Sequence, residues 1–176
     1  DAAFSKTRRK GYKENIASWG QLGLNGIFTK MPVSLYGRNS ASGTYGFFKE
    51  EVLENGDFKD AVKEQPGSAS VVQGVTEDHA GMGYSGIGYN TSGVRALPLS
   101  MKPGQPFVEP TYENATSGGY PLSRYLFVYV NKAPNQPLSP IVREFLKYVY
   151  TREGQRVVIK DGYFPMSEKI IQKQLE

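Results

Sequence analysis

The sequence PVSLYGRNSASGTYGFFKEEVL, residues 32–53, contains the clearest change of pattern in the chain. Residues 32–36 alternate apolar side chains with smaller or polar ones, which predicts a brief β-strand. Residues 45–53 carry apolar side chains at near-helical spacing, which predicts a helix. Between them, residues 37–44 are small and polar, as in a loop. This stretch is therefore expected to run from a strand through a polar loop into a helix.

The loop Gly37–Thr44 carries the groups that a small oxyanion requires. A helix start leaves backbone N–H groups unpaired and has about half a positive charge from the helix dipole. Small residues let an anion approach this backbone closely, and Ser42 and Thr44 add hydroxyl donors. Arg38 adds a guanidinium that can bind an oxyanion in a bidentate manner. The loop thus predicts a site for a tetrahedral oxyanion, with ordinary helix capping and a solvated arginine as the alternative.

The same loop does not fit a nucleotide-binding P-loop. That motif has four residues between its glycines, followed by lysine and a hydroxyl residue. Here five residues separate Gly37 from Gly43, and no lysine follows. ATP hydrolysis is therefore not expected.

The rest of the chain alternates between short helices and short strands. The pattern predicts a turn at 58–63, a helix at 67–78, a buried strand or close backbone approach followed by a turn at 81–89, a strand at 94–99, a connecting loop at 100–119, a strand at 125–130, and helices at 140–150, at 153–161 and after Pro165. The strand at 125–130, YLFVYV, is the strongest of these predictions, because a continuous apolar run is typical of a strand covered on both faces. Such alternation predicts the α/β class.

Composition excludes several kinds of site. The 176 residues include one histidine and no cysteine. Thiol nucleophiles, iron–sulfur clusters and cysteine or multi-histidine metal sites cannot be built from this sequence, so no metal and no cofactor is expected. The net charge of +4 is small and dispersed. The densest basic cluster, Lys6–Lys10, lacks interleaved aromatic residues, so no nucleic-acid partner is expected.

Several blocks of sequence, taken in order, resemble one known family. The motif Arg38-x-x-x-Ser42-Gly43-Thr44, followed by Phe47-Phe48, resembles the phosphate-anchoring loop of the PstS-like phosphate-binding proteins of ABC transporters. Further blocks similar to that family are Trp19–Leu22, Gly86–Tyr89, Tyr120–Arg124, Phe127–Lys132, Glu153–Gln155 and Gly162–Pro165. Together these blocks extend over nearly the whole chain.

The resemblance implies a periplasmic or cell-surface protein with two α/β lobes and a ligand cleft between them. This chain is expected to form one lobe, with a central mixed sheet flanked by helices, and the C-terminal part of the other lobe. It also implies that Arg38, Ser42, Gly43 (through its backbone) and Thr44 bind phosphate. The family often has an acidic residue two positions after the arginine, which orients it. Here that residue is Ser40, so Arg38 is expected to be held less rigidly or by another partner.

The same resemblance predicts how the chain divides. Residues 1–117 correspond to the second lobe and residues 118–176 to the C-terminal part of the first lobe. Members of the family are longer and begin with a segment that supplies further phosphate donors. We therefore expect a fragment, one part of a split chain or a truncated form, completed by an N-terminal half. Without that partner, the apolar faces of residues 125–130 and 141–149 would lack cover.

The implied function is high-affinity binding of inorganic phosphate and its delivery to an ABC transporter permease, without catalysis. Two alternatives remain open: an extracytoplasmic phosphoester hydrolase on the same fold, and a surface adhesion protein with a vestigial cleft. For the hydrolase, the single histidine is His79, and no Gly-x-Ser-x-Gly nucleophile motif accompanies it. His79 is therefore interpreted as structural.

Overall fold

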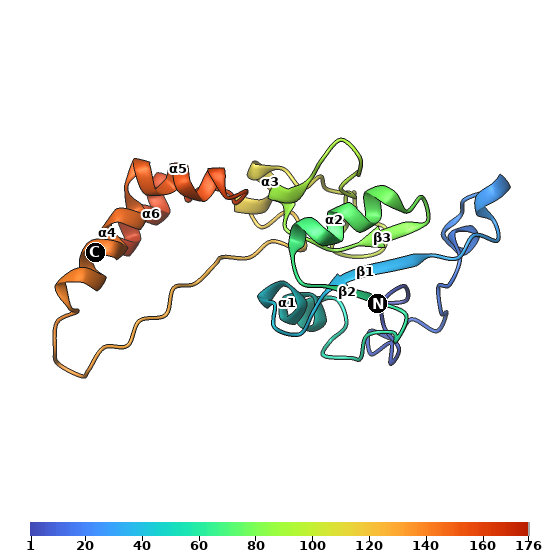
Figure 1. Cartoon of the computed structure of the whole chain (residues 1–176), viewed down its shortest axis with the longest axis horizontal. Coiled ribbons are helices and arrows are strands. Elements are labelled where there is room, and N and C mark those ends of the chain that lie inside the picture. The colour runs from blue at the N-terminus through green and yellow to red at the C-terminus, as the bar shows by residue number, and fades with distance from the viewer. Residues whose placement is uncertain (176) are drawn as a thin grey trace. The chain divides into compact units, whose positions relative to one another are not determined.

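The computed structural model describes residues 1–175. The chain forms two compact units, Asp1–Pro98 and a second unit that begins at Leu99 (Figure 1). The assignment of residues 1–117 and 118–176 to two lobes remains a prediction.

The first unit is built on a parallel β-sheet with the strand order β2-β1-β3. The central strand is β1 (Ser34–Arg38), and its neighbours are β2 (Lys63–Gln65) and β3 (Gly81–Gly83). Both neighbours pair with β1 in parallel, with Tyr36 opposite Lys63 on one side and Gly83 on the other. The α/β class is confirmed, while these three strands are all parallel in place of the mixed sheet that the resemblance predicts. The physical reason is that a helix follows each of the first two strands and returns the chain to the same starting edge.

Two helices cover this sheet: α1 (Gly43–Glu51) joins β1 to β2, and α2 (Ser68–Glu77) joins β2 to β3. They lie on opposite faces (Figure 1), because their right-handed crossovers run in opposite directions across the sheet. Both helices begin just after the carboxyl end of a parallel strand. Their N-termini therefore lie at the same edge of the sheet.

Aromatic side chains fill the core between α1 and the sheet. The rings of Phe48 and Tyr84 stack with their centroids 4.0 Å apart, and Phe4 contacts both edge-on, at 5.2 and 5.7 Å. Leu53 and Val71 are also fully buried. The N-terminal segment thus contributes to the core through Phe4. Short 3₁₀-helices complete this unit at Trp19–Leu22, Gly26–Phe28 and Ile87–Tyr89.

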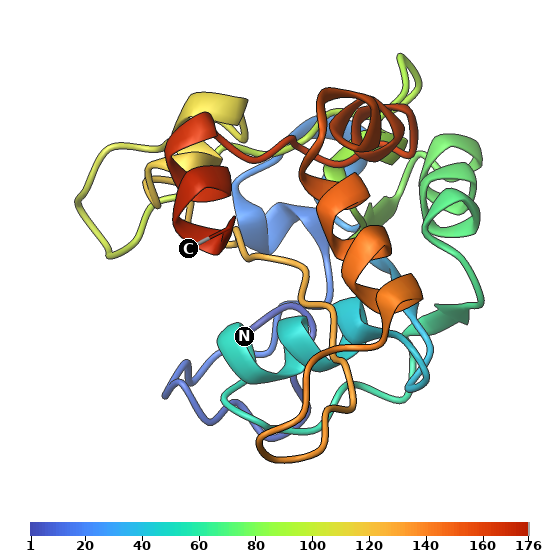
Figure 2. The same cartoon turned by 90° about the vertical axis from the view of Figure 1, so that its left-hand side faces the viewer.

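The second unit contains four helices among the described residues. They are α3 (Tyr112–Thr116), α4 (Pro140–Tyr150), α5 (Arg152–Lys160) and α6 (Glu168–Leu175), and Figure 2 shows α4 to α6 in orange and red. The predicted helices at 140–150 and 153–161 and after Pro165 are confirmed. None of the helices in the described part of the chain is both long and apolar enough to cross a bilayer.

Gln155 ties the helical segments of this unit together. Its Nε2 donates to the carbonyl of Val149 at 2.8 Å, and its Oε1 accepts from the backbone N–H of Met166 at 2.8 Å. The side chain is buried, with 7% exposed. It thus joins the end of α4 to the segment that precedes α6.

The strand predicted at residues 125–130 is wrong for this structure. The segment forms no β-ladder with any described residue, and its side chains are exposed, including Phe127 at 70% and Tyr129 at 90%. A strand needs a neighbour that accepts and donates its backbone hydrogen bonds. The apolar pattern of residues 125–130 indicates side chains suited to burial, but a strand forms only where a neighbouring strand is present.

Three smaller predictions also differ from the structure. Residues 94–99 form no strand, because only Leu99 pairs, in an isolated bridge with Val108. The turn expected at 58–63 ends where β2 begins, and the loop expected at 100–119 contains α3. These elements are three to five residues long, too short to show a clear periodicity.

Candidate anion-binding site

Arg38 is the last residue of β1, and its side chain is directed toward the start of α2. Its Nη1 donates to the Ser68 hydroxyl at 2.8 Å, and its Nη2 donates to the Pro66 carbonyl at 3.1 Å. Its Nε is buried and has no hydrogen-bond partner among the described residues. A guanidinium has five N–H donors. Arg38 is thus held at two points and retains donors, one of them a buried N–H.

Ser42, Gly43 and Thr44 form the N-terminus of α1. Ser42 is the N-cap, and its hydroxyl oxygen accepts from the backbone N–H of Thr44 at 3.1 Å. The capping role considered from the sequence is therefore present. This capping bond uses the Ser42 oxygen and leaves the hydroxyl hydrogen free to donate. The backbone N–H of Gly43, at the first position of α1, has no acceptor within the helix. Both donors are available to an anion.

Several sources of positive potential meet at this edge of the sheet. The N-termini of α1 and α2 follow β1 and β2, and neither helix has an acidic residue in its first turn. Arg38 ends β1, just before the loop that leads to α1, and its guanidinium bonds to Ser68 at the start of α2. Helix N-termini and a guanidinium all favour a bound anion.

The structure places the four predicted residues at one sheet edge, but it does not join all of them. No hydrogen bond among the described residues links Arg38 to Ser42 or Thr44, since the guanidinium bonds instead to Ser68 and Pro66. Sequence reasoning missed these two residues. Pro66-Gly67-Ser68 before a helix is a recognisable helix start. Only the parallel pairing of β2 with β1, however, brings it to Arg38.

Tyr84 supports the backbone at Arg38 from the aromatic core. Its hydroxyl donates to the Arg38 carbonyl at 3.5 Å. Burial raises the pKa of Tyr84 to about 12, so this hydroxyl stays protonated at neutral pH. The end of β1 is thus held by a neutral donor.

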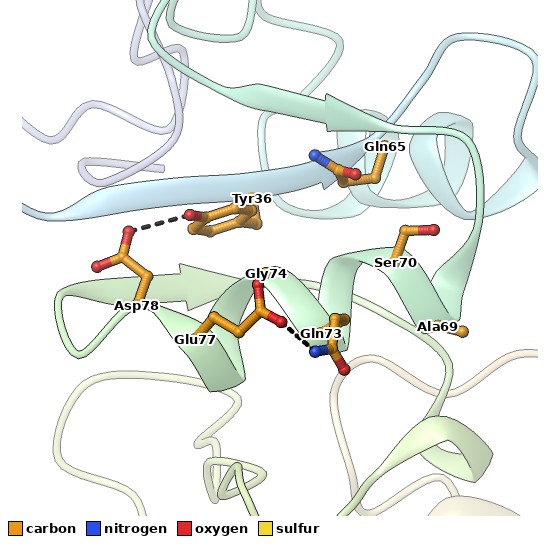
Figure 3. A pocket seen from close by; sticks show the side chains of 8 residues that line it. All are labelled: Tyr36, Gln65, Ala69, Ser70, Gln73, Gly74, Glu77 and Asp78. Atoms are coloured by element: carbon orange, nitrogen blue, oxygen red, sulfur yellow. Dashed lines mark hydrogen bonds between the residues drawn. The ribbon is translucent and has the colours of Figure 1, made fainter.

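A second polar cluster includes Tyr36 and Asp78, which line a hollow of about 630 Å³ beside α2 (Figure 3). The hydroxyl of Tyr36 donates to Asp78 Oδ2 at 3.0 Å, and Lys63 Nζ lies 3.0 Å from that hydroxyl and 3.4 Å from Asp78 Oδ2. Hydrogen bonds from the Ser34 side chain and the Ala80 backbone N–H lower the pKa of Asp78 to about 2. These groups satisfy one another, so the cluster serves to tie β1, β2 and the end of α2 together.

The described residues contain no group of three or more histidine, cysteine, aspartate or glutamate side chains that could hold a metal ion. The donors of the candidate site are N–H and hydroxyl groups. Its chemistry therefore suits an anion.

Comparison with known proteins gives consistent results. The phosphate-binding protein PstS of Pseudomonas aeruginosa is 56% identical over 176 residues, which are 100% of this chain and 54% of that protein. The PstS of Staphylococcus haemolyticus is 30% identical over 96% of this chain and 52% of that protein. A solved structure assigned as a phosphate ABC transporter substrate-binding protein with bound phosphate, from Clostridium perfringens, aligns with a TM-score of 0.65 at 25% identity, covering 86% of this chain and 58% of that one.

This chain spans about half the length of the curated relatives it matches. The similarity nevertheless includes both compact units, since the family match runs from the N-terminal segment into α5. Residues 6–153 match the PBP superfamily domain, and the chain belongs to that superfamily.

Proposed function

We propose that the chain is part of an extracytoplasmic protein that binds inorganic phosphate and delivers it to an ABC transporter permease, without catalysing a reaction. The observation that carries this proposal is the buried, unpartnered Nε of Arg38, at the sheet edge where α1 and α2 begin. A buried donor without a partner costs about 1–3 kcal/mol. A bound oxyanion would supply the missing acceptor. The names of the relatives support phosphate as that oxyanion.

In this proposal, phosphate binds to the Arg38 guanidinium, the Ser42 and Thr44 hydroxyls and the Gly43 backbone N–H. Hydrogen bonds to a charged group contribute about 1.5–3 kcal/mol each, net of the water contacts that they replace, so these donors together would favour binding. No bond of the ligand is broken. The groups around it are donors, which matches a binding role better than that of a nucleophile and base.

We also propose that an N-terminal half of the binding protein covers the apolar surface of the second unit and completes the cleft. That surface consists of residues 125–130 together with Ile141, Phe145 and Tyr148 of α4. Ile141 is 79% exposed and Phe145 is 52% exposed, although α4 is strongly amphipathic in sequence. The proposal is supported by the share of the relatives, close to half of their length, that the chain does not span. It assigns residues 1–117 to the second lobe and 118–176 to the first.

The test is isothermal titration calorimetry with phosphate, sulfate and arsenate. It uses the chain alone and a chimera in which the chain replaces the matching 54% of the Pseudomonas aeruginosa relative. We expect saturable phosphate binding by the chimera and its loss in Arg38→Ala. Arg95→Ala, at an exposed position of the same unit, serves as the matched control.

Two results would contradict the proposal: phosphate binding that is unchanged by Arg38→Ala, and turnover of a chromogenic phosphate ester by the chimera. The amide signals of Gly43 and Thr44, followed by NMR in the chain alone, give a second measurement. We expect phosphate to shift these signals. Sulfate at the same concentration is the comparison ligand.

A further inference from the structure

We propose that Ser68 is a positioning residue for Arg38, which makes the start of α2 part of the anion site. This inference rests on the proposed function, since it assigns a role within the phosphate site. Ser68 is the first residue of α2, and its hydroxyl accepts from Arg38 Nη1 at 2.8 Å. Thirty residues separate the two in sequence. The contact therefore exists only because β1 and β2 pair in parallel.

The guanidinium of Arg38 is held in a defined orientation. An arginine side chain loses rotamer entropy when it is ordered. Here the Ser68 hydroxyl holds Nη1 and the Pro66 carbonyl holds Nη2, and two contacts on different nitrogens orient the planar group. The buried Nε–H is left without a partner among the described residues. The two contacts thus order the group while leaving its Nε donor for the ligand.

The partners that hold the Arg38 guanidinium are uncharged. Ser40, two positions after Arg38, is exposed, and no ion pair of Arg38 with a carboxylate is found among the described residues. Ser68 and Pro66 offer a neutral hydroxyl and a neutral carbonyl. A carboxylate would orient the guanidinium but would also cancel much of its charge toward an anion. The neutral partners orient Arg38 and leave its charge available.

Ser68 is itself held in place, and its hydroxyl is free to bind Arg38. Its backbone carbonyl accepts from the Ser85 hydroxyl at 3.1 Å. The N-cap of α2 is Gly67, which has no side-chain cap. The Ser68 hydroxyl is therefore not required for capping. Ser70, two residues further along α2, lines the hollow beside that helix instead (Figure 3) and gives a matched control.

The experiment titrates phosphate into the chimera carrying Ser68→Ala, Ser68→Thr or Ser70→Ala, each in the Arg38 and the Arg38→Lys background. We expect Ser68→Ala to weaken phosphate binding about tenfold, which corresponds to one lost orienting hydrogen bond. Ser68→Thr, which keeps the hydroxyl, and Ser70→Ala are expected to change the affinity by less than about twofold. In the Arg38→Lys background, Ser68→Ala is expected to have no further effect, because the two residues act as one unit.

A second readout does not depend on phosphate. In ¹⁵N-arginine NMR of the chain, the two Nη groups of Arg38 should give separate signals, because their hydrogen bonds slow rotation of the guanidinium. These signals should merge in Ser68→Ala and stay separate in Ser70→Ala. Unchanged Nη signals in Ser68→Ala would overturn the proposal. So would an equal loss of phosphate affinity in the Arg38 and Arg38→Lys backgrounds, which would indicate a general structural role. Failure of the unsubstituted chimera to bind phosphate would instead overturn the proposed function, while the NMR comparison still decides whether Ser68 orients Arg38.

Discussion

Tyr84 packs its ring directly against Gly37, so closely that a Cβ at residue 37 would lie 2.8 Å from the Cε1 atom of that ring. Gly37 precedes Arg38 in β1, and the Tyr84 hydroxyl also reaches the Arg38 carbonyl. The aromatic core and the candidate site therefore contact the same end of β1. The packing of Tyr84 against β1 therefore fixes the backbone position from which the Arg38 side chain extends.

Gly37→Ala is expected to destabilise the chain by about 1–3 kcal/mol, because the added methyl overpacks a buried aromatic core. Urea unfolding followed by circular dichroism measures this change. The control is Gly46→Ala in the interior of α1, where a new Cβ meets nothing within 4 Å. There alanine should stabilise the helix by about 0.5–1 kcal/mol. Equal effects of the two substitutions would contradict the role given to the Tyr84 contact.

Leu53→Ala is expected to cost about 2–5 kcal/mol, since the side chain is fully buried and its removal leaves a cavity. The free energy of unfolding in urea gives the measurement. Leu24→Ala, in the same unit but with 37% of the residue exposed, should cost less than about 1 kcal/mol. A Leu53→Ala protein as stable as the Leu24→Ala protein would show that residue 53 lies outside the core.

Stability should decrease at acidic pH partly through Asp78. Its pKa is lowered from 3.8 to about 2 in the folded chain, so the folded state binds this proton less readily than the unfolded state does. The contribution of Asp78 is therefore fully present above about pH 4 and is lost as the pH falls toward 2. Urea unfolding between pH 2 and 6 should show a shallower acid decline in Asp78→Asn.

Asp60→Asn is the control for that experiment. Asp60 pairs with Lys6 at the surface, where 84% of its side chain is exposed, and such pairs contribute little. Its acid decline should match that of the unsubstituted chain. An unchanged profile in Asp78→Asn would indicate that the cluster with Tyr36 and Lys63 does not stabilise the fold.

The apolar surface of the second unit should bind hydrophobic dyes and promote self-association of the isolated chain. The double substitution Ile141→Ser and Phe145→Ser is expected to reduce dye fluorescence and the sedimentation coefficient. The control is Arg143→Ser, whose exposed guanidinium pairs with Glu144 on the same helix. In the chimera, the N-terminal half should suppress dye binding by the unsubstituted sequence. Dye binding that persists there would contradict the proposed cover.

The helices of this protein were largely predictable from the sequence, because the signals for them are local. Ser139-Pro140 before an apolar periodic run predicts the start of α4, and the Gly162 that follows α5 adopts φ +83°, as a residue after a helix end often does. The loop Gly37–Thr44 was likewise recognisable as a helix start rich in donors. The short strand β2, and the absence of a strand at 125–130, were not predictable, because strand formation depends on a partner elsewhere in the chain.

Local sequence was thus sufficient for the α/β alternation, for the caps of α1 and α5 and for the kinds of donor near Arg38. The tertiary structure alone decided the strand order β2-β1-β3, which places Pro66 and Ser68 against the Arg38 guanidinium. Helix periods and caps arise between residues a few positions apart, whereas sheet pairing joins segments separated by many residues. The arrangement of the candidate site therefore depended on that pairing, which the residue pattern of either strand does not specify.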